Sequence, residues 1–174
     1  MNSPSRQNLK KIILAEYKKC MDDPIYFMRK YCHIQHPIKG KMLFDLYPFQ
    51  ENALRMILKS RQLGISTLVA GYSLWKMTFQ QDFNVLVIAT NQDTAKNLVT
   101  KVRVMYDYLP SWLKEKHADH NKLSLRLQNG SQIKAVSSTG TAGRSEALSL
   151  LVFDEAAFID KIDDIWTSAQ STLS

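Results

Sequence analysis

Two adjacent acids, Asp154 and Glu155, follow an apolar segment at residues 148–153. A pair of this kind can divide the work of nucleotide hydrolysis. The first carboxylate holds Mg²⁺, directly or through water, and the second orients and polarises the attacking water. A buried strand ending in these acids would hold them at the sheet edge where ligands bind in open α/β folds. The alternative is structural, because acids in the first turn of a helix are also stabilised by the helix dipole.

A candidate phosphate-binding segment lies earlier, at residues 59–67 (KSRQLGIST). Compared with the P-loop pattern GxxxxGK[ST], Gly64 and Ser66 take the last glycine and the hydroxyl positions. Ile65 stands where the pattern has its lysine, and Lys59 stands where it has its first glycine. The segment could also be an ordinary polar turn before a helix, and the residues alone leave both interpretations open.

Phosphate binding at this segment does not require the usual lysine position. Backbone N–H groups and the positive end of the following helix attract phosphate, and Gly64 permits close approach of the backbone. Ser66, or Thr67 beside it, can supply a hydroxyl ligand to Mg²⁺. A cation is still needed near the terminal phosphates. Lys59 at the entrance of the segment is the first candidate, and Arg61 is the second.

The elements that must position these residues alternate between helices and strands. Asn129-Gly130, with alternating polarity on both sides, predicts a β-hairpin. The order predicts an α/β fold with a mostly parallel sheet, flanking helices and one hairpin. The expected elements are a helix at 66–79, a buried parallel strand at 85–90, a helix capped by Thr90 or Asn91 that runs to about 109, hairpin strands at 123–127 and 131–136, and a strand at 148–153.

Residues 1–40 predict a helical N-terminal region, followed by the α/β domain over residues 41–174. Asp22-Asp23-Pro24 is expected to divide the first region into two helices. Residues 33–40 are expected to form a loop and residues 42–47 a short strand. A further helix is expected to begin within Tyr47-Pro48-Phe49-Gln50.

Composition narrows the class of protein. The chain has 174 residues, of which 45% are hydrophobic, and this is enough for one domain with a core. Its net charge of +7 favours contact with a polyanion such as nucleic acid, although a solvated basic surface would give the same charge. No run of 18 apolar residues predicts a membrane span. The two cysteines and four histidines lack the spacing of a zinc site.

Together these segments resemble the large terminase subunits of tailed phages, including the T4-type packaging motors, over about residues 20–174. Ser60-Arg61-Gln62-Leu63-Gly64 followed by Ser66-Thr67 resembles the family's phosphate loop. Several family members place the lysine at the first position of this loop, where Lys59 falls. Residues 151–159 (LVFDEAAFI) resemble the family's Walker B segment. Tyr47-Pro48-Phe49-Gln50 resembles its adenine-recognition motif.

The resemblance implies the fold of a P-loop NTPase and an ATPase that uses ATP and Mg²⁺. Gln50 would hydrogen-bond the adenine edge, and an aromatic side chain would pack on the ring. Arg61 resembles a family arginine that acts on the γ-phosphate within its own subunit, and Arg144 resembles one that reaches a neighbouring subunit's ATP. The implied site comprises Glu155, Arg61 and Arg144 for catalysis, Gln50, Lys59, Ser60, Gln62, Gly64, Ser66 and Thr67 for nucleotide binding, and Ser66 and Asp154 for Mg²⁺.

The resemblance also implies partners and a location. The expected partners are double-stranded DNA moved into a procapsid, a portal protein, a small terminase subunit and further copies of the chain in a ring, with no membrane. The expected location is the host cytoplasm, transiently on the procapsid portal, and not as a structural protein of the virion.

Three features depart from the family pattern. Ile65 replaces the lysine of T4-type members, and only eight residues separate Gln50 from Lys59 where the family fits a helix, a turn and a strand. No coupling motif or nuclease domain is recognisable before Ser174, so nuclease activity is not expected. Two alternatives therefore stay open: a nucleotide- or DNA-binding domain without turnover, and a helicase-type DNA translocase.

Overall fold

The N-terminal region forms two helices that meet at an aspartate cap. The computed structural model describes residues 6–36, 39–53, 64–138, 147–160, 162–170 and 172. Helix α1 (Arg6–Asp22) is followed directly by α2 (Pro24–Tyr31). The Asp23 side chain accepts hydrogen bonds from the N–H groups of Ile25 and Tyr26, and Pro24 takes the first helical position. The predicted break between two helices is therefore confirmed.

A small two-stranded sheet follows these helices. Strands β1 (His33–His36) and β2 (Gly40–Leu43) pair in antiparallel register, and α3 (Pro48–Ala53) comes next. The loop expected at 33–40 and the strand expected at 42–47 were both misplaced. The reason is that Phe44 and Leu46 are buried in the main core beyond the end of β2, so their apolar character does not mark a strand.

The central sheet has five strands in the order β4-β5-β6-β3-β7. Strand β3 lies between β6 and β7 and is parallel to both, while β4, β5 and β6 pair in antiparallel fashion. The α/β class and the hairpin are confirmed, and the sheet is mixed. Its strands are β3 (Asn84–Ala89), β4 (His117–Asn121), β5 (Ser124–Leu127), β6 (Gln132–Ser137) and β7 (Leu150–Phe153), and the helical elements are α4 (Ile65–Phe79), α5 (Gln92–Asp107), η1 (Ala156–Phe158) and α6 (Ile162–Gln170).

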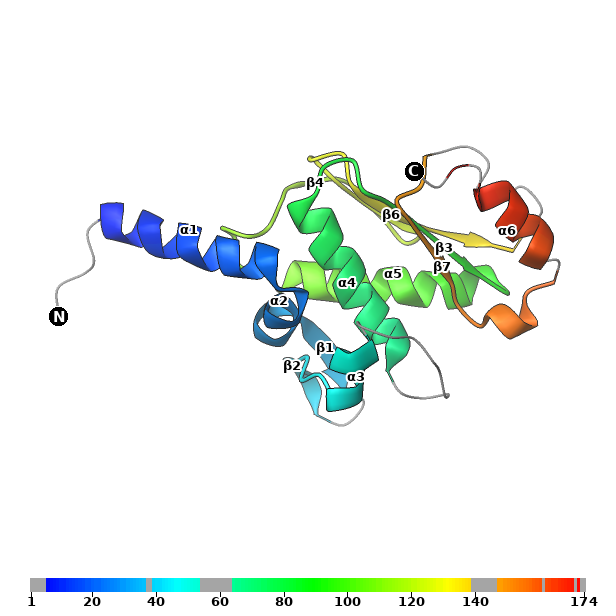
Figure 1. Ribbon diagram of the computed structural model, residues 1–174, viewed down its shortest axis with the longest axis horizontal. Helices are drawn as coiled ribbons and strands as arrows, with labels where there is room; N and C mark the ends of the chain where they lie inside the picture. Colours follow the sequence, from blue (N-terminus) through cyan, green and yellow to red (C-terminus); the bar gives the residue numbers. More distant parts are fainter. Residues whose placement is uncertain are drawn as a thin grey trace.

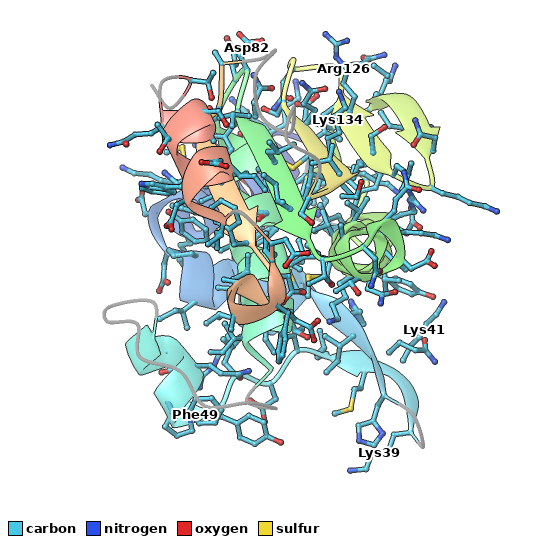
Figure 2. The ribbon with its side chains drawn as sticks, turned by 90° about the vertical axis from the view of Figure 1, so that its right-hand side faces the viewer. Lys39, Lys41, Phe49, Asp82, Arg126 and Lys134 are labelled. Atoms are coloured by element: carbon cyan, nitrogen blue, oxygen red, sulfur yellow. The ribbon has the colours of Figure 1, made fainter. Side chains whose placement is uncertain are left out.

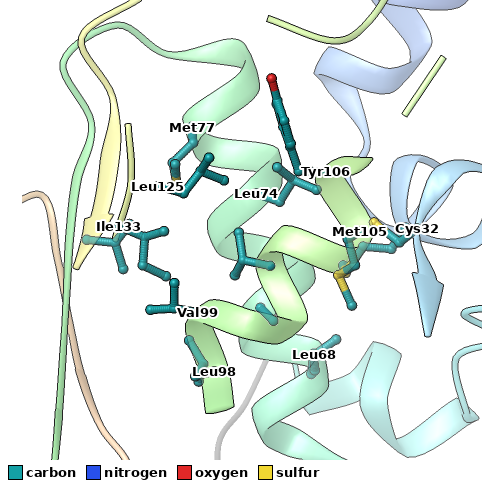
Figure 3. Packing of buried hydrophobic residues seen from close by; sticks show 14 of the residues in the cluster. Cys32, Leu68, Leu74, Met77, Leu98, Val99, Met105, Tyr106, Leu125 and Ile133 are labelled. Carbon is teal, nitrogen blue, oxygen red and sulfur yellow. The ribbon is translucent and has the colours of Figure 1, made fainter. Parts of the chain in front are cut away.

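Helices cover both faces of this sheet (Figure 1). Helices α4 and α5 pack on one face through a large apolar cluster, part of which Figure 3 shows, and α6 packs on the other face through a smaller cluster around Leu86, Ile88 and Ile165. Burial on both faces explains why β3 is apolar without alternation. None of the described helices is long and apolar enough to cross a membrane.

The large cluster continues into the N-terminal helices. Phe27, Met28 and Cys32 are buried in the same cluster as residues of α4 and α5. Gly71 of α4 leaves the space that Met28 fills, since a Cβ built there would lie 2.5 Å from the Met28 sulfur. The core therefore runs across residue 40, and the division of the chain at that residue stays a prediction.

The tip of the β5–β6 hairpin fixes the direction of α4. The Asn129 amide donates hydrogen bonds to the carbonyls of Met77 (2.7 Å) and Gln80 (3.0 Å), and the Ser131 hydroxyl donates to Gln80 as well (2.9 Å). These bonds satisfy carbonyls that the end of a helix leaves unpaired. A short turn then leads from α4 into β3. Helix α4 therefore runs back along the sheet, and it begins at the end where β3 finishes.

Candidate functional site

The parallel strands bring three chain segments together at one edge of the sheet. The Asp154 N–H donates to the Ile88 carbonyl at 2.9 Å, directly beyond the paired residues Ile88 and Phe153. On the other side of β3, the Ser138 N–H donates to the Ala89 carbonyl at 3.1 Å. Asp154 is therefore held at the carboxyl edge of the sheet, as the sequence predicted. The strand before it is half-buried at the end of the described strand order and not fully buried as expected.

Glu155 has a backbone conformation that a glutamate rarely adopts. Its φ is 56° and its ψ is 43°, which is the left-handed region, and a non-glycine residue there is strained by about 1 kcal/mol. The residue occupies the N-cap position of η1, yet its side chain makes no capping hydrogen bond. The carboxylate is exposed, beside the half-buried Asp154. The capping role considered for this pair is not seen for Glu155, and backbone strain of this kind is found preferentially at functional sites.

The start of α4 lacks the side-chain cap that α2 and α5 have. Asp23 and Asn91 cap α2 and α5 with side-chain oxygens, whereas the N-cap residue of α4 is Gly64, which offers no side-chain cap. Gly64 is in the left-handed region with a φ of 66°. The first turn of α4 thus presents backbone N–H groups at the positive end of a helix without a capping side chain from its N-cap residue, an arrangement that suits an anion.

Gln50 contacts this helix start directly. Its side chain is 2% exposed, its amide oxygen accepts from the Tyr47 N–H at 2.9 Å, and its amide nitrogen donates to the Gly64 carbonyl at 3.4 Å. A Cβ at Gly64 would lie 2.7 Å from that nitrogen. The family resemblance implies a role for Gln50 toward adenine. The structure adds a contact with Gly64 of the candidate phosphate-binding segment, which no spacing in the sequence indicated.

Two aromatic side chains stand beside Gln50. The rings of Tyr47 and Phe49 are stacked, with centroids 5.7 Å apart and planes 7° apart, and both are exposed. Figure 2 shows Phe49 at the end of the molecule opposite Asp82, which lies in the turn between α4 and β3. The aromatic pair is therefore at the end where α4 begins. The sequence expected one aromatic ring to pack on a base without selecting it, and these two are the described candidates.

The hydroxyls of the first turn of α4 lie in different surroundings. The Thr67 side chain lines a cavity of about 200 Å³ with residues of β1 and α5, among them His33, Gln35 and Lys101. Ser66 is not among the residues that line this cavity. It precedes Thr67 by about 100° around the helix. The two side chains therefore leave α4 in different directions.

The structure describes only part of the predicted site. It brings Gln50 to Gly64. It also places the start of α4 and the end of β7, which the acids 154 and 155 follow, at the same end of the sheet, as Figures 1 and 2 show. The remaining predicted positions, Lys59, Ser60, Arg61, Gln62 and Arg144, lie outside the described residues. Among the described residues, no three histidine, cysteine, aspartate or glutamate side chains group as metal ligands.

Comparison with known proteins assigns the family. The model of the family described as "Terminase large subunit, T4likevirus-type, N-terminal" matches residues 56–174. The chain belongs to this terminase family. The match includes the segment at 59–67 and the acids at 154 and 155, so the proposed phosphate loop and Walker B segment both lie within the terminase domain.

Solved structures of terminases have the same fold. The large terminase of bacteriophage HK97 superposes with a TM-score of 0.69 at 20% identity, over 88% of this chain and 36% of that chain. A mutant of the large terminase ATPase domain of Thermus phage P74-26 gives a TM-score of 0.56 at 19% identity, over 74% of this chain and 60% of that one. The chain thus spans about a third of the length of the HK97 terminase, and at these identities the likeness concerns the fold.

Proposed function

We propose that this terminase chain is a Mg²⁺-dependent ATPase that drives duplex DNA into a viral procapsid. The observation that carries the proposal is that two features lie at the same end of the sheet. One is the start of α4 at Gly64, which offers no side-chain cap, and the other is the acid pair at the end of β7. Phosphates suit the first feature and a magnesium ion suits the second, and a magnesium nucleotide needs both. The similar Thermus phage structures are of terminase ATPase domains, in agreement with this assignment.

The described residues fit a magnesium nucleotide. Gly64 has a left-handed backbone and adds no side-chain cap, so the N–H groups of the first turn of α4 stay available to a phosphate. Ser66 and Asp154 supply one hydroxyl and one carboxylate, which are hard oxygen ligands of the kind Mg²⁺ prefers, with water completing the shell. When bound, Mg²⁺ neutralises charge that develops on the phosphates during transfer. Tyr47 or Phe49 can pack on the base.

Each residue has a distinct task in this proposal. The N–H groups of the first turn of α4 bind phosphate oxygens, and Lys59 adds positive charge from the entrance of the loop. Glu155, whose exposed carboxylate is set by its left-handed backbone, orients and polarises the attacking water. Arg61 or Arg144 stabilises the charge that builds up on the transferred phosphoryl group.

The wider role extends the proposal to partners. A net charge of +7 supports contact with the DNA backbone. The family assignment supports work at a portal, together with a small terminase subunit and a ring of copies, in the host cytoplasm. Binding to duplex DNA through these charges should weaken steeply as salt rises.

Phosphate release separates an active ATPase from a domain that only binds nucleotide. The wild-type chain should release phosphate from ATP only with Mg²⁺. Glu155→Gln should lower this rate by about 10²–10⁴-fold while a fluorescent ATP analogue still binds. The matched control is Asp107→Asn, which neutralises an exposed acid at the far end of α5 and should leave the rate unchanged. Equal, background-level release from wild type and Glu155→Gln with binding intact would reject turnover and favour the binding domain.

A further inference from the structure

Helix α1 carries a basic patch that the fold does not use. We define the basic patch as Lys10, Lys11, Leu14, Lys18 and Met21. The lysines lie three or four residues from Leu14 and Met21 lies seven residues from it, so all five share one side of the helix. The Leu14 side chain is 70% exposed and Met21 is 41% exposed. Within the described residues, none of the three lysines takes part in an ion pair.

An acidic patch lies after the candidate site. We define the acidic patch as Phe158, Asp160, Asp163, Asp164 and Trp166, on η1, α6 and the turn between them. Phe158 is 59% exposed and Trp166 is 46% exposed, and the three aspartates are exposed as well. These aspartates form no ion pair with any described residue. On the inner side of α6, Ile165 is buried against the sheet, so the acidic patch faces outward.

The two patches match each other and lie far apart on one molecule. Figure 1 shows α1 and α6 at opposite ends of the longest axis. Six of the ten large apolar side chains that are exposed among the described residues belong to α1, η1 or α6. Exposed apolar residues gathered with charges of one sign are typical of protein interfaces. A chain with complementary surfaces at its two ends is suited to bind a second copy of itself.

We propose that the basic patch of one copy docks on the acidic patch of the next copy, head to tail. The three lysines face the three aspartates, and Leu14 and Met21 pack against Phe158 and Trp166. This proposal rests on the proposed function in one respect, because it names the interface of the ring that the packaging role implies. A head-to-tail contact closes into a ring when its rotation permits.

The position of the acidic patch links assembly to the candidate site. Segment η1 begins directly after Glu155, whose strained backbone starts the turn that carries Phe158. A neighbouring α1 that packs on Phe158 therefore stabilises the conformation that sets the Glu155 carboxylate. Occupation of the acidic patch by a second copy should rigidify the turn after the acids.

Charge reversal tests the interface without nucleotide. Light scattering after size exclusion, over a range of protein concentrations and at low and high salt, would measure self-association. Lys10→Glu/Lys11→Glu/Lys18→Glu should weaken self-association at least about tenfold, and Asp160→Lys/Asp163→Lys/Asp164→Lys should do the same. The chain with all six changes should associate again, because the charges are exchanged between the two patches. The control Lys116→Glu/Lys122→Glu/Arg126→Glu changes the net charge by the same amount as the triple lysine variant, at other exposed positions. It should associate as wild type does.

Three results would overturn the proposal. They are a wild-type chain that stays monomeric at every concentration, a folded six-fold variant that does not regain association, and a triple lysine variant that associates normally. In the last case, loss of DNA binding would assign the lysines to nucleic acid. Leu14→Ser provides a check that does not depend on charge, since this exposed side chain adds little to the core, and it should also weaken association. A chain that associates as described but releases no phosphate would contradict the ATPase and leave this interface standing.

Discussion

Substitution of Gly64 by alanine tests the contact between the predicted adenine motif and the candidate phosphate-binding segment. Gly64 has a φ of 66°, and the Cβ of an alanine there would lie 2.7 Å from the amide nitrogen of Gln50. Something must therefore move. Gln50 is only 2% exposed, so its amide cannot swing into solvent without leaving its bond to the Tyr47 N–H.

The expected cost has two parts. An alanine in the left-handed region is strained by about 1–2 kcal/mol, and displacement of Gln50 loses about 1 kcal/mol of hydrogen bonding. Gly64→Ala should therefore lower the free energy of unfolding by about 2–3 kcal/mol. Gly40→Ala is a matched control, because Gly40 has a φ of 69° but no atom within 4 Å of its Cβ position. It should lose only the strain, about 1–2 kcal/mol.

A double-mutant cycle with Gln50→Ala isolates the contact. Chemical denaturation of the wild type, both single variants and the double variant gives the coupling energy, and a fluorescent ADP analogue gives the nucleotide affinity of each. Gln50→Ala removes the group that a Cβ at Gly64 meets, so the double variant should be more stable than the sum of the single effects. Equal costs for Gly64→Ala and Gly40→Ala, together with an additive cycle, would refute the contact.

Three further predictions concern other parts of the fold. Glu155→Gly should abolish phosphate release and yet raise the free energy of unfolding by up to about 1 kcal/mol, since glycine relieves the left-handed strain; a clear loss of stability in thermal denaturation would contradict this. Asn129→Ala should cost about 2 kcal/mol in denaturant, because the Met77 carbonyl loses its side-chain donor, the Gln80 carbonyl loses one of two donors and the Ser131 N–H loses its acceptor. The exposed neighbour control Gln128→Ala should cost little, and equal costs would argue against the cap. The hydrogen bond from Lys30, opposed by desolvation and aided by two tyrosine hydroxyls, lowers the pKa of Glu16 from 4.5 to about 2. The stabilisation from the Glu16 carboxylate is therefore present above pH 4.5 and is lost as the pH falls toward 2. Glu16→Gln should make the free energy of unfolding less dependent on pH in that window, and an unchanged slope would speak against it.

Helix-capping and turn residues in the sequence predicted much of the fold. Asp23 with Pro24 marks the boundary of two helices, Asn91 caps α5 by accepting from the Thr94 N–H, and Asn129-Gly130 forms the tip of the hairpin. Each of these residues acts on backbone groups a few positions away. For that reason a single sequence is enough to recognise them.

Strands without an apolar face could not be predicted in the same way. Strand β4 reads HADHN, and the described side chains along it are exposed, so burial leaves no alternating pattern. Strand β1 reads HIQH and is held by its pairing with β2, which is information that its own residues do not carry. Both segments therefore form strands because they pair with a neighbouring strand.

In the candidate site, too, local patterns could be predicted and tertiary contacts could not. The acids were predictable, because an apolar segment that ends in Asp154-Glu155 is a local pattern. The left-handed conformation of Glu155 was not, since no residue type there favours it. The contact of Gln50 with Gly64 joins residues fourteen positions apart through tertiary packing, and no spacing rule indicates it.

The central claim is that the start of α4 and the acid pair share one magnesium nucleotide. A crystal structure of the chain with Mg²⁺ and a non-hydrolysable ATP analogue tests it most directly. We expect phosphate oxygens on the N–H groups of the first turn of α4, and Mg²⁺ about 2.1 Å from the Ser66 hydroxyl and beside the Asp154 carboxylate, directly or through one water. Lys59 should reach the terminal phosphates. A nucleotide bound elsewhere, or a magnesium ion far from Asp154, would contradict the account.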